Sequence, residues 1–180
     1  MVTVADSSRL SFRLMGQEDA QPLWELDQDP EVMQFINGGK PNSIETINEV
    51  FLPRMQAYTD ASKGWGIWQV SNKVTKEYLG WVLVRPMDFF TDKANFVDLE
   101  LGWRFFKKAW GEGYATEAAI AIKDAVVEQT DTLFVSATAL DDNLGSIGVM
   151  KKMGMKFIKE YTHTEPRGDF IAVHYQMQIK

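Results

Sequence analysis

The feature that most constrains the fold is the stretch from Glu100 to Val126, ELGWRFFKKAWGEGYATEAAIAIKDAV. It begins with a strand pattern and passes through a short basic loop with two glycines. It then continues directly into a helix pattern, in which apolar residues recur at helical spacing from Ala115 to Val126. A glycine-rich turn that opens a helix collects unpaired backbone N–H groups at the positive end of the helix dipole. The stretch therefore predicts a phosphate-binding loop.

Spacing distinguishes between the phosphate-binding loops that use this physics. The P-loop requires Gly-x-x-x-x-Gly-Lys-Ser/Thr, which does not occur in this chain. The dinucleotide fingerprint requires Gly-x-Gly-x-x-Gly, but Thr116 stands where the third glycine would follow Gly111 and Gly113. Taken alone, the two glycines are equally consistent with a tight strand-to-helix turn that binds nothing.

Three segments carry a resemblance to a known family. They are LELGW from Leu99 to Trp103, KAWGEGYATEA from Lys108 to Ala118, and DNLGSIGVMKKMGM from Asp142 to Met155. In this order they resemble the GNAT acyltransferases, in particular the RimJ/RimL-like subgroup, and the likeness covers nearly the whole chain. The loop is similar to the family's pyrophosphate loop, Gln/Arg-x-x-Gly-x-Gly/Ala. Lys108 departs from the family's Gln or Arg, which leaves the loop amides unaffected.

The resemblance implies a single GNAT domain over residues 1–180 and an acetyl-CoA-dependent N-acetyltransferase. Acetyl-CoA is then the co-substrate, and the acceptor is a primary amine on a protein N-terminus or a small molecule. Because no Ser-His-Asp or Cys-His set is apparent, we expect direct attack within a ternary complex rather than an acyl-enzyme. No pattern in the sequence identifies the amine. Folds of this family often form homodimers, although nothing in the sequence demonstrates one.

Hydrophobic periodicity and turn residues predict the order of the elements. The expected strands are residues 10–15, 65–71, 78–85, 96–103, 132–139, 157–162 and 170–178, and the expected helices are residues 17–28, 30–35, 43–58, 115–126 and 144–153. Pro53 predicts a kink or break in the third helix, while Ser43, Asn143 and Gly154 predict helix ends. The order indicates a mixed α/β (α+β) fold around one largely antiparallel sheet, and the resemblance implies that this sheet is splayed at its centre.

The strand at residues 96–103 brings two carboxylates together. Asp98, Glu100 and Gly102 share one face of this strand, whereas apolar residues share the other. An alkyl amine is mostly protonated at neutral pH, so a general base assists its attack. The resemblance places Glu100 at the family's catalytic position, and we expect it to be this base, with Asp98 as a second candidate. The alternative is that Glu100 only pairs with a basic residue or meets solvent.

For the donor, the resemblance implies two sets of contacts. Unpaired backbone groups of the splayed strand bond the pantetheine arm, and the loop amides hold the pyrophosphate. The residues concerned are Leu101, Gly102 and Trp103 in the strand, and Lys108, Ala109, Trp110, Gly111, Glu112, Gly113, Tyr114 and Ala115 in and after the loop. Lys107 and Lys108 either meet the phosphates, including the ribose 3′-phosphate, or form an ordinary solvated basic pair.

The thiolate that leaves needs a proton or a hydrogen bond. Many relatives place a tyrosine at the position of Met150, so that acid is absent here. Ser146, three residues after Asn143, resembles the subgroup's Asn-x-x-Ser pattern and is the candidate that protonates or solvates the thiolate. Its alternative role is to bond backbone in the first turn of its helix. Asn143 is the expected N-cap, and the resemblance also places it beside the pantetheine.

Composition excludes several other classes. The 180 residues include no cysteine, which excludes disulfides, cysteine-ligated zinc and a thiol nucleophile. The spacing of the carboxylates suggests no metal site, and a net charge of −6 argues against nucleic-acid binding. No apolar run is long enough to cross a membrane and no signal peptide is apparent, so we expect no membrane association and a cytoplasmic location.

Two rival interpretations stay open. In the first, a degenerate protein of the same fold binds acyl-CoA as a sensor without catalysis, which the missing tyrosine allows. In the second, a different nucleotide-binding enzyme uses the same loop for another ligand. The acceptor site is expected partly in the early helices and in aromatic loops. Its candidate residues are Trp24, Phe35, Phe51, Tyr58, Phe89 and Phe90.

Overall fold

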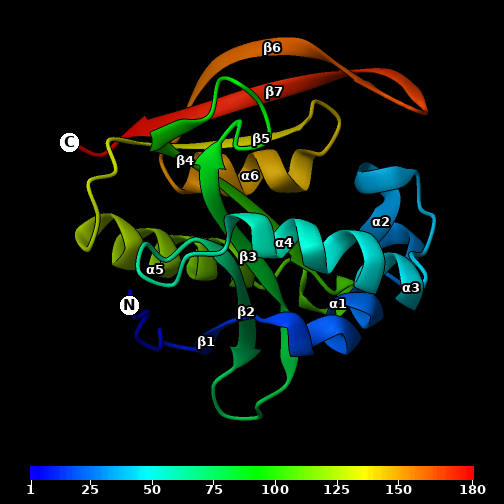
Figure 1. The fold of residues 1–180 in the computed structure, drawn as a ribbon, viewed down its shortest axis with the longest axis horizontal. Coiled ribbons are helices and arrows are strands. Elements are labelled where there is room, and N and C mark those ends of the chain that lie inside the picture. The colour runs from blue at the N-terminus through cyan, green and yellow to red at the C-terminus, as the bar shows by residue number, and fades with distance from the viewer.

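The computed structural model describes residues 1–180, and its seven strands form one sheet. The strands are β1 (Leu10–Leu14), β2 (Gly66–Asn72), β3 (Tyr78–Met87), β4 (Asn95–Phe105), β5 (Phe134–Leu140), β6 (Lys156–Glu165) and β7 (Gly168–Gln178). They lie in the order β1-β2-β3-β4-β5-β7-β6, and every neighbouring pair is antiparallel except β4 and β5, which run parallel. The predicted mixed α/β fold around one largely antiparallel sheet is confirmed (Figure 1).

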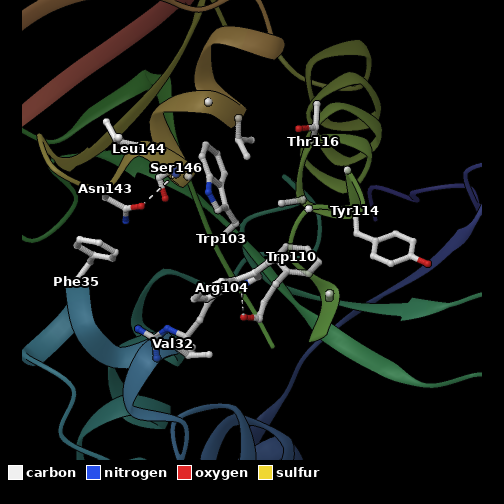
Figure 2. A pocket seen from close by; sticks show the side chains of 18 of the residues that line it. Val32, Phe35, Trp103, Arg104, Trp110, Tyr114, Thr116, Asn143, Leu144 and Ser146 are labelled. Atoms are coloured by element: carbon white, nitrogen blue, oxygen red, sulfur yellow. Dashed lines mark hydrogen bonds between the residues drawn. The ribbon is translucent and has the colours of Figure 1, made fainter. Parts of the chain in front are cut away.

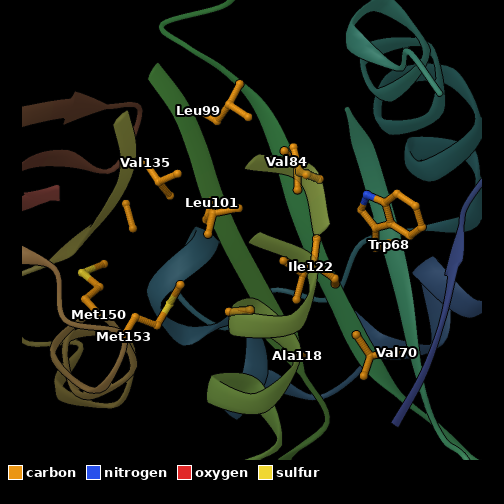
Figure 3. Close-up of a cluster of buried hydrophobic side chains, with 14 of the residues drawn as sticks. Trp68, Val70, Val84, Leu99, Leu101, Ala118, Ile122, Val135, Met150 and Met153 are labelled. Carbon is orange, nitrogen blue, oxygen red and sulfur yellow. The ribbon is translucent and has the colours of Figure 1, made fainter. Parts of the chain in front are cut away.

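Helices cover both faces of this sheet. They are α1 (Ala20–Leu26), α2 (Pro30–Asn37), α3 (Ile44–Thr46), α4 (Leu52–Tyr58), α5 (Tyr114–Glu128) and α6 (Leu144–Lys152). Val82 of β3 belongs to a core cluster with Ile122 of α5, whereas the adjacent Trp81 belongs to a second cluster with Leu23 of α1 and Met55 of α4. Because successive strand residues point to opposite faces, α5 and α6 cover one face and the early helices cover the other. Figure 3 shows the first cluster, with Ile122 facing the strands. No helix is both long and apolar enough to span a bilayer.

The sheet opens between β4 and β5. Their register covers only residues 98–100 against residues 134–136, although β4 continues to Phe105 and β5 to Leu140. On its other side, β4 stays paired with β3 as far as Phe105. The two central strands therefore diverge after Glu100, and the splay implied by the resemblance is confirmed.

The predicted helix from residue 43 to residue 58 is interrupted ahead of its proline. Ser43 accepts a hydrogen bond from the N–H of Thr46 at 3.1 Å, so it is the N-cap as predicted. Residues Ile47–Phe51 then form a π-helical turn, which the N–H of Leu52 closes by donating to the C=O of the first residue of the turn. Pro53, which has no N–H to donate, follows directly in α4. The expected break is confirmed as a widened turn before the proline.

Several strand boundaries predicted from the sequence are wrong by one to three residues; β6, for example, ends at Glu165 rather than at residue 162. Two of these differences have a clear local cause. Strand β3 does not end at Arg85 but continues through Pro86, which is paired with Leu99. The proline is tolerated because Leu99, like the other odd-numbered residues of β4, directs its backbone groups toward β5, so this pair needs no N–H from β3. The register between β3 and β4 shifts directly after it. Strand β5 begins at Phe134 rather than at Thr132, whose buried hydroxyl bonds that of Thr130.

Candidate active site

A cavity of about 640 Å³ lies beside β4, beyond the point where this strand parts from β5 (Figure 2). Its lining comes from α2, the last residues of β4, the loop before α5 with the first turn of that helix, and one side of α6 along its whole length to Lys152. Of the predicted site residues, it brings together Trp103, Ala109, Trp110, Gly111, Gly113, Tyr114, Ala115, Asn143 and Ser146. Those that do not line it are Glu100, Leu101, Gly102, Lys108 and Glu112.

The loop before α5 presents a run of unused backbone donors. None of the N–H groups from Gly111 to Thr116 has an acceptor within the protein, and the next, that of Glu117, donates to the C=O of Gly113 at 3.0 Å. Gly111 and Gly113 both have a φ of +78°, a left-handed conformation that glycine adopts without steric cost. Free donors at the positive end of a helix dipole favour an anion, so this geometry fits a phosphate group.

The two lysines of the loop are occupied by carboxylates. Lys107 forms an ion pair with Glu31 of α2, and Lys108 forms one with Glu77, which lies just before β3. All four side chains are largely exposed, so these pairs are weak. Neither lysine is therefore held at the run of free N–H groups, and Lys108 lies outside that run.

Arg9, which sequence analysis missed, is the cation that the loop itself holds. Its Nη1 donates to the C=O of Glu112 at 2.9 Å, and its guanidinium lies 4.4 Å from the centre of the Tyr114 ring. No local pattern could have indicated this contact, because 103 residues separate Arg9 from Glu112.

The backbone of β4 offers hydrogen-bonding groups to the cavity side of the splay. The C=O of Val97 accepts from the N–H of Leu133, which shows that the odd-numbered residues of β4 direct their backbone groups toward β5. The register with β5 ends at Glu100, so the groups of Trp103 face the splay without a strand partner. Farther along, the C=O of Phe105 accepts from Nε1 of Trp110 at 2.9 Å.

Arg104 lies in the cavity wall, as Figure 2 shows, and sequence analysis did not single it out. It forms an ion pair with Asp27, which is 1% exposed, and its guanidinium lies 5.0 Å from the ring of Trp81. Its Nε has no partner in the protein. A buried ion pair of this kind is costly to break, because either partner alone would be an uncompensated charge.

Helix α6 brings Ser146, the residue predicted to protonate or solvate the leaving thiolate, to the cavity. The side-chain oxygen of Asn143 accepts from the N–H of Ser146 at 3.1 Å, so Asn143 is the N-cap as predicted. The hydroxyl of Ser146 has no hydrogen-bond partner within the protein, and Figure 2 shows this residue at the cavity. The alternative role of bonding backbone is therefore not what the structure shows. Met150 is 1% exposed and belongs to the core.

Glu100 is held by its neighbour on the adjacent strand. Its carboxylate accepts from Nε of Arg85 at 2.7 Å, and the two residues are register partners on β4 and β3. The side chains are 17% and 20% exposed, so neither is fully solvated. The structure thus shows Glu100 paired with a basic residue, as the alternative interpretation of this residue expected. Its catalytic role stays a prediction.

Asp98, which shares its face of β4 with Glu100, is the more deeply buried of the two carboxylates. Its Oδ2 accepts from Ser136 Oγ at 3.0 Å and from Gln176 Nε2 at 2.9 Å, while Oδ1 is buried without a partner. Burial raises the pKa of Asp98, and the two hydrogen bonds only partly offset this. His174 Nε2 lies 2.9 Å from Ser136 Oγ, and burial lowers the pKa of His174. Ser136 and Gln176, which contact Asp98, and His174, which contacts Ser136, were not predicted, since only the register of β4, β5 and β7 brings them together.

The aromatic residues proposed for the acceptor site divide into two groups. Phe35 lines the cavity, where Val32 and Ile36 join it as an apolar wall on α2. The others pack elsewhere: Tyr58 is buried, Phe89 and Phe90 lie edge-on to its ring, and Trp24 and Phe51 pack against the core under the early helices.

Comparison with known proteins assigns the chain to a family. The family described as "Acetyltransferase (GNAT) domain" matches residues 9–156. The chain therefore belongs to the GNAT acetyltransferase family.

Individual proteins to which the chain is similar support the same fold. The FsC-acetyl coenzyme A-N(2)-transacetylase of Aspergillus fumigatus is 27% identical over 162 residues, which are 86% of this chain and 66% of the relative, so the chain spans just under two thirds of that protein. A GNAT-family acetyltransferase from Bacillus anthracis superposes with a TM-score of 0.79 at 21% identity, covering 98% of both chains. RimL, a ribosomal L7/L12 alpha-N-protein acetyltransferase in complex with coenzyme A, gives a TM-score of 0.77 at 13% identity, covering 98% of this chain and 97% of its own.

Proposed function

We propose that this protein is an acetyl-CoA-dependent N-acetyltransferase of RimJ/RimL-like type, built as one domain over residues 1–180. The observation that carries the proposal is the run of free N–H groups from Gly111 to Thr116 at one side of a cavity that also contains Trp103 and Ser146. The names of two relatives add support, since one acts with acetyl coenzyme A and the other binds coenzyme A.

The residues present fit such a donor. The run of N–H groups would hold the pyrophosphate at the positive end of α5. The cavity then leads past the free backbone of Trp103 and the hydroxyl of Ser146, which suits a pantetheine arm with its amide groups and its thioester. The adjoining wall on α2 is apolar.

Direct attack is the mechanism that these groups support. A neutral amine attacks the thioester carbonyl, the C–S bond breaks, and the amine loses a proton while the thiolate gains one or is solvated. Ser146 is the proposed group at the thiolate, because its hydroxyl is free and lines the cavity. Glu100 is the proposed base, held in place by Arg85, and it would act through water because it does not line the cavity.

The acceptor that we propose is a primary amine. The two relatives are named as an N(2)-transacetylase and an alpha-N-protein acetyltransferase, so a small molecule and a protein N-terminus are both represented. We place the acceptor on the side of α2, where Val32, Phe35 and Ile36 line the cavity and would contact the carbon skeleton around the amine.

One alternative has an observation in its favour. Met150 is buried where many relatives carry the tyrosine acid, and Glu100 is held in an ion pair, which together favour a sensor that binds acyl-CoA without turnover. Such a protein would bind coenzyme A as tightly as an enzyme does. It would release no free thiol with any amine.

The test is thermal unfolding with acetyl-CoA, CoA, NAD and ATP in parallel, followed by a thiol-release assay on an amine panel. A ligand at a hundred times its Kd stabilises by about 2.7 kcal/mol, a shift of roughly 5 to 10 °C for a chain of this size. Shifts with both CoA forms and thiol release with an amine are the expected result. A shift with NAD or ATP alone would contradict acetyl-CoA as the donor. If the CoA forms bind but no peptide, polyamine or amino acid is turned over, the sensor is favoured.

A further inference from the structure

The segment that precedes β1 is tied to the first turn of α5 through one carboxylate. Glu117 accepts three hydrogen bonds there: from Ser7 Oγ at 2.7 Å, from the N–H of Arg9 at 2.9 Å and from Arg9 Nε at 2.6 Å. Arg9 also reaches the loop itself, because its Nη1 donates to the C=O of Glu112. The N-terminal segment thus holds both ends of the run of free N–H groups.

The guanidinium of Arg9 is fixed in orientation beside this run. Its face lies 4.4 Å from the centre of the Tyr114 ring, and Tyr114 is the first residue of α5. Nη2 has no partner in the protein and lies on the side of Gly113, where a Cβ would be 3.6 Å from it. A lysine could not reproduce this arrangement, because its ammonium is a single point charge without a planar fork.

The charge of Glu117 opposes the binding of an anionic ligand at this loop. Burial disfavours the ionised carboxylate, but the hydrogen bonds from Ser7 and Arg9 outweigh it and lower the pKa of Glu117, so the group is charged at neutral pH. An anion in the first turn stabilises the helix. However, it also repels any phosphate bound at the free N–H groups, and Glu112 adds a second carboxylate within the loop.

We infer that Arg9 is a positioning residue for the donor, which holds the phosphate loop and offsets the charge of Glu117 beside the bound phosphates. This inference rests on the proposed function. Lys107 and Lys108 do not supply the same compensation, because they are exposed and paired with Glu31 and Glu77. Arg9 therefore sets the affinity for the donor rather than the rate of acyl transfer.

The test compares donor binding by calorimetry, with coenzyme A as the probe, in Arg9→Ala, Arg9→Lys and the control Arg13→Ala. Arg13 is a matched control, since it lies on β1, pairs with Asp19 and is 48% exposed against 42% for Arg9. We expect Arg9→Ala to raise the Kd for coenzyme A by about tenfold, as the loss of one charge-assisted contact does. The KM for acetyl-CoA should rise in parallel with little change in kcat. The Kd of Arg9→Lys should lie between those of the wild type and Arg9→Ala, and the Kd of Arg13→Ala should equal that of the wild type.

The double variant Arg9→Ala/Glu117→Gln separates charge compensation from a structural role. If Arg9 offsets Glu117, removing the carboxylate recovers most of the lost affinity. If Arg9 only ties the chain together, the double variant binds no better than Arg9→Ala, and the inference is wrong. Unchanged binding in Arg9→Ala overturns this inference alone, whereas a wild-type protein that does not bind coenzyme A overturns the proposed function with it.

Discussion

The carboxylate of Glu100 accepts a hydrogen bond from Nε of Arg85 at 2.7 Å, across the register between β4 and β3. Both side chains are largely shielded from solvent, so the pair is screened less than a surface ion pair. Arg85 also lies 5.6 Å from the ring centres of Tyr58 and Phe90. The candidate base is thus held by a cation that itself lies near the rings of Tyr58 and Phe90.

Glu100→Gln should abolish most turnover without loss of the donor. A general base contributes about 10²- to 10⁴-fold to the rate, and glutamine has the shape of glutamate without its basicity. We expect kcat to fall within that range while the Kd for coenzyme A stays unchanged, because Glu100 does not line the cavity. Steady-state kinetics and calorimetry check this. Full activity of the variant would show that Glu100 only pairs with Arg85.

Ser146→Ala should separate catalysis from stability. Its hydroxyl has no partner in the protein, so its removal should leave the unfolding midpoint unchanged. If the hydroxyl protonates or solvates the thiolate, kcat should fall by about a hundredfold. Asn143→Ala is the comparison for stability: the loss of the N-cap should cost about 1 kcal/mol, a loss that Ser146→Ala should not show. An active Ser146→Ala enzyme would assign the thiolate proton to water.

Gly111→Ala tests the phosphate loop through its backbone. A Cβ at this position would meet nothing within 4 Å, so the cost comes only from the left-handed φ of +78°. That cost is about 1 to 2 kcal/mol, and the loop can escape it by changing conformation, which would turn its N–H groups away from the phosphates.

Gly154→Ala is the matched control for this loop variant. Gly154 has a φ of +85°, also with open space around a Cβ, and it lies after α6 rather than in the cavity lining. Both variants should lose similar stability in chemical denaturation, but only Gly111→Ala should bind coenzyme A more weakly. Equal binding in the two variants would argue against the phosphate loop.

Asp98 should make the protein less stable as pH rises. Burial raises its pKa in the folded state above the ordinary value of 3.8, so the folded protein favours the protonated form. The folded state therefore binds more protons than the unfolded state in this window, and stability falls as pH increases through the raised pKa. Asp98→Asn should remove this loss. Denaturant unfolding of both proteins between about pH 4 and pH 7 checks it. Parallel pH profiles would show that Asp98 does not titrate in this way.

Local patterns predicted much of the fold because they depend on residues close in sequence. The break at Pro53, the caps at Ser43 and Asn143 and the helix end at Gly154 each rest on interactions within a few residues. Strand ends were less predictable. Proline normally ends a strand, but Pro86 continues one because its partner Leu99 directs its backbone groups toward β5, so the missing N–H leaves no bond to β4 unmade.

The sequence alone determined the strand, loop and helix that place free N–H groups at Gly111 to Thr116, since a glycine turn before a helix exposes these donors in any surrounding. Only the tertiary structure decided which charges meet. Arg9 reaches Glu117 across 108 residues, Ser136 reaches Asp98 across 38, and Glu100 pairs with Arg85 rather than with solvent. These contacts depend on strand register and on the packing of distant segments. Hydrophobic periodicity indicates which face of a strand is buried, but not which polar side chain lies opposite on the next strand.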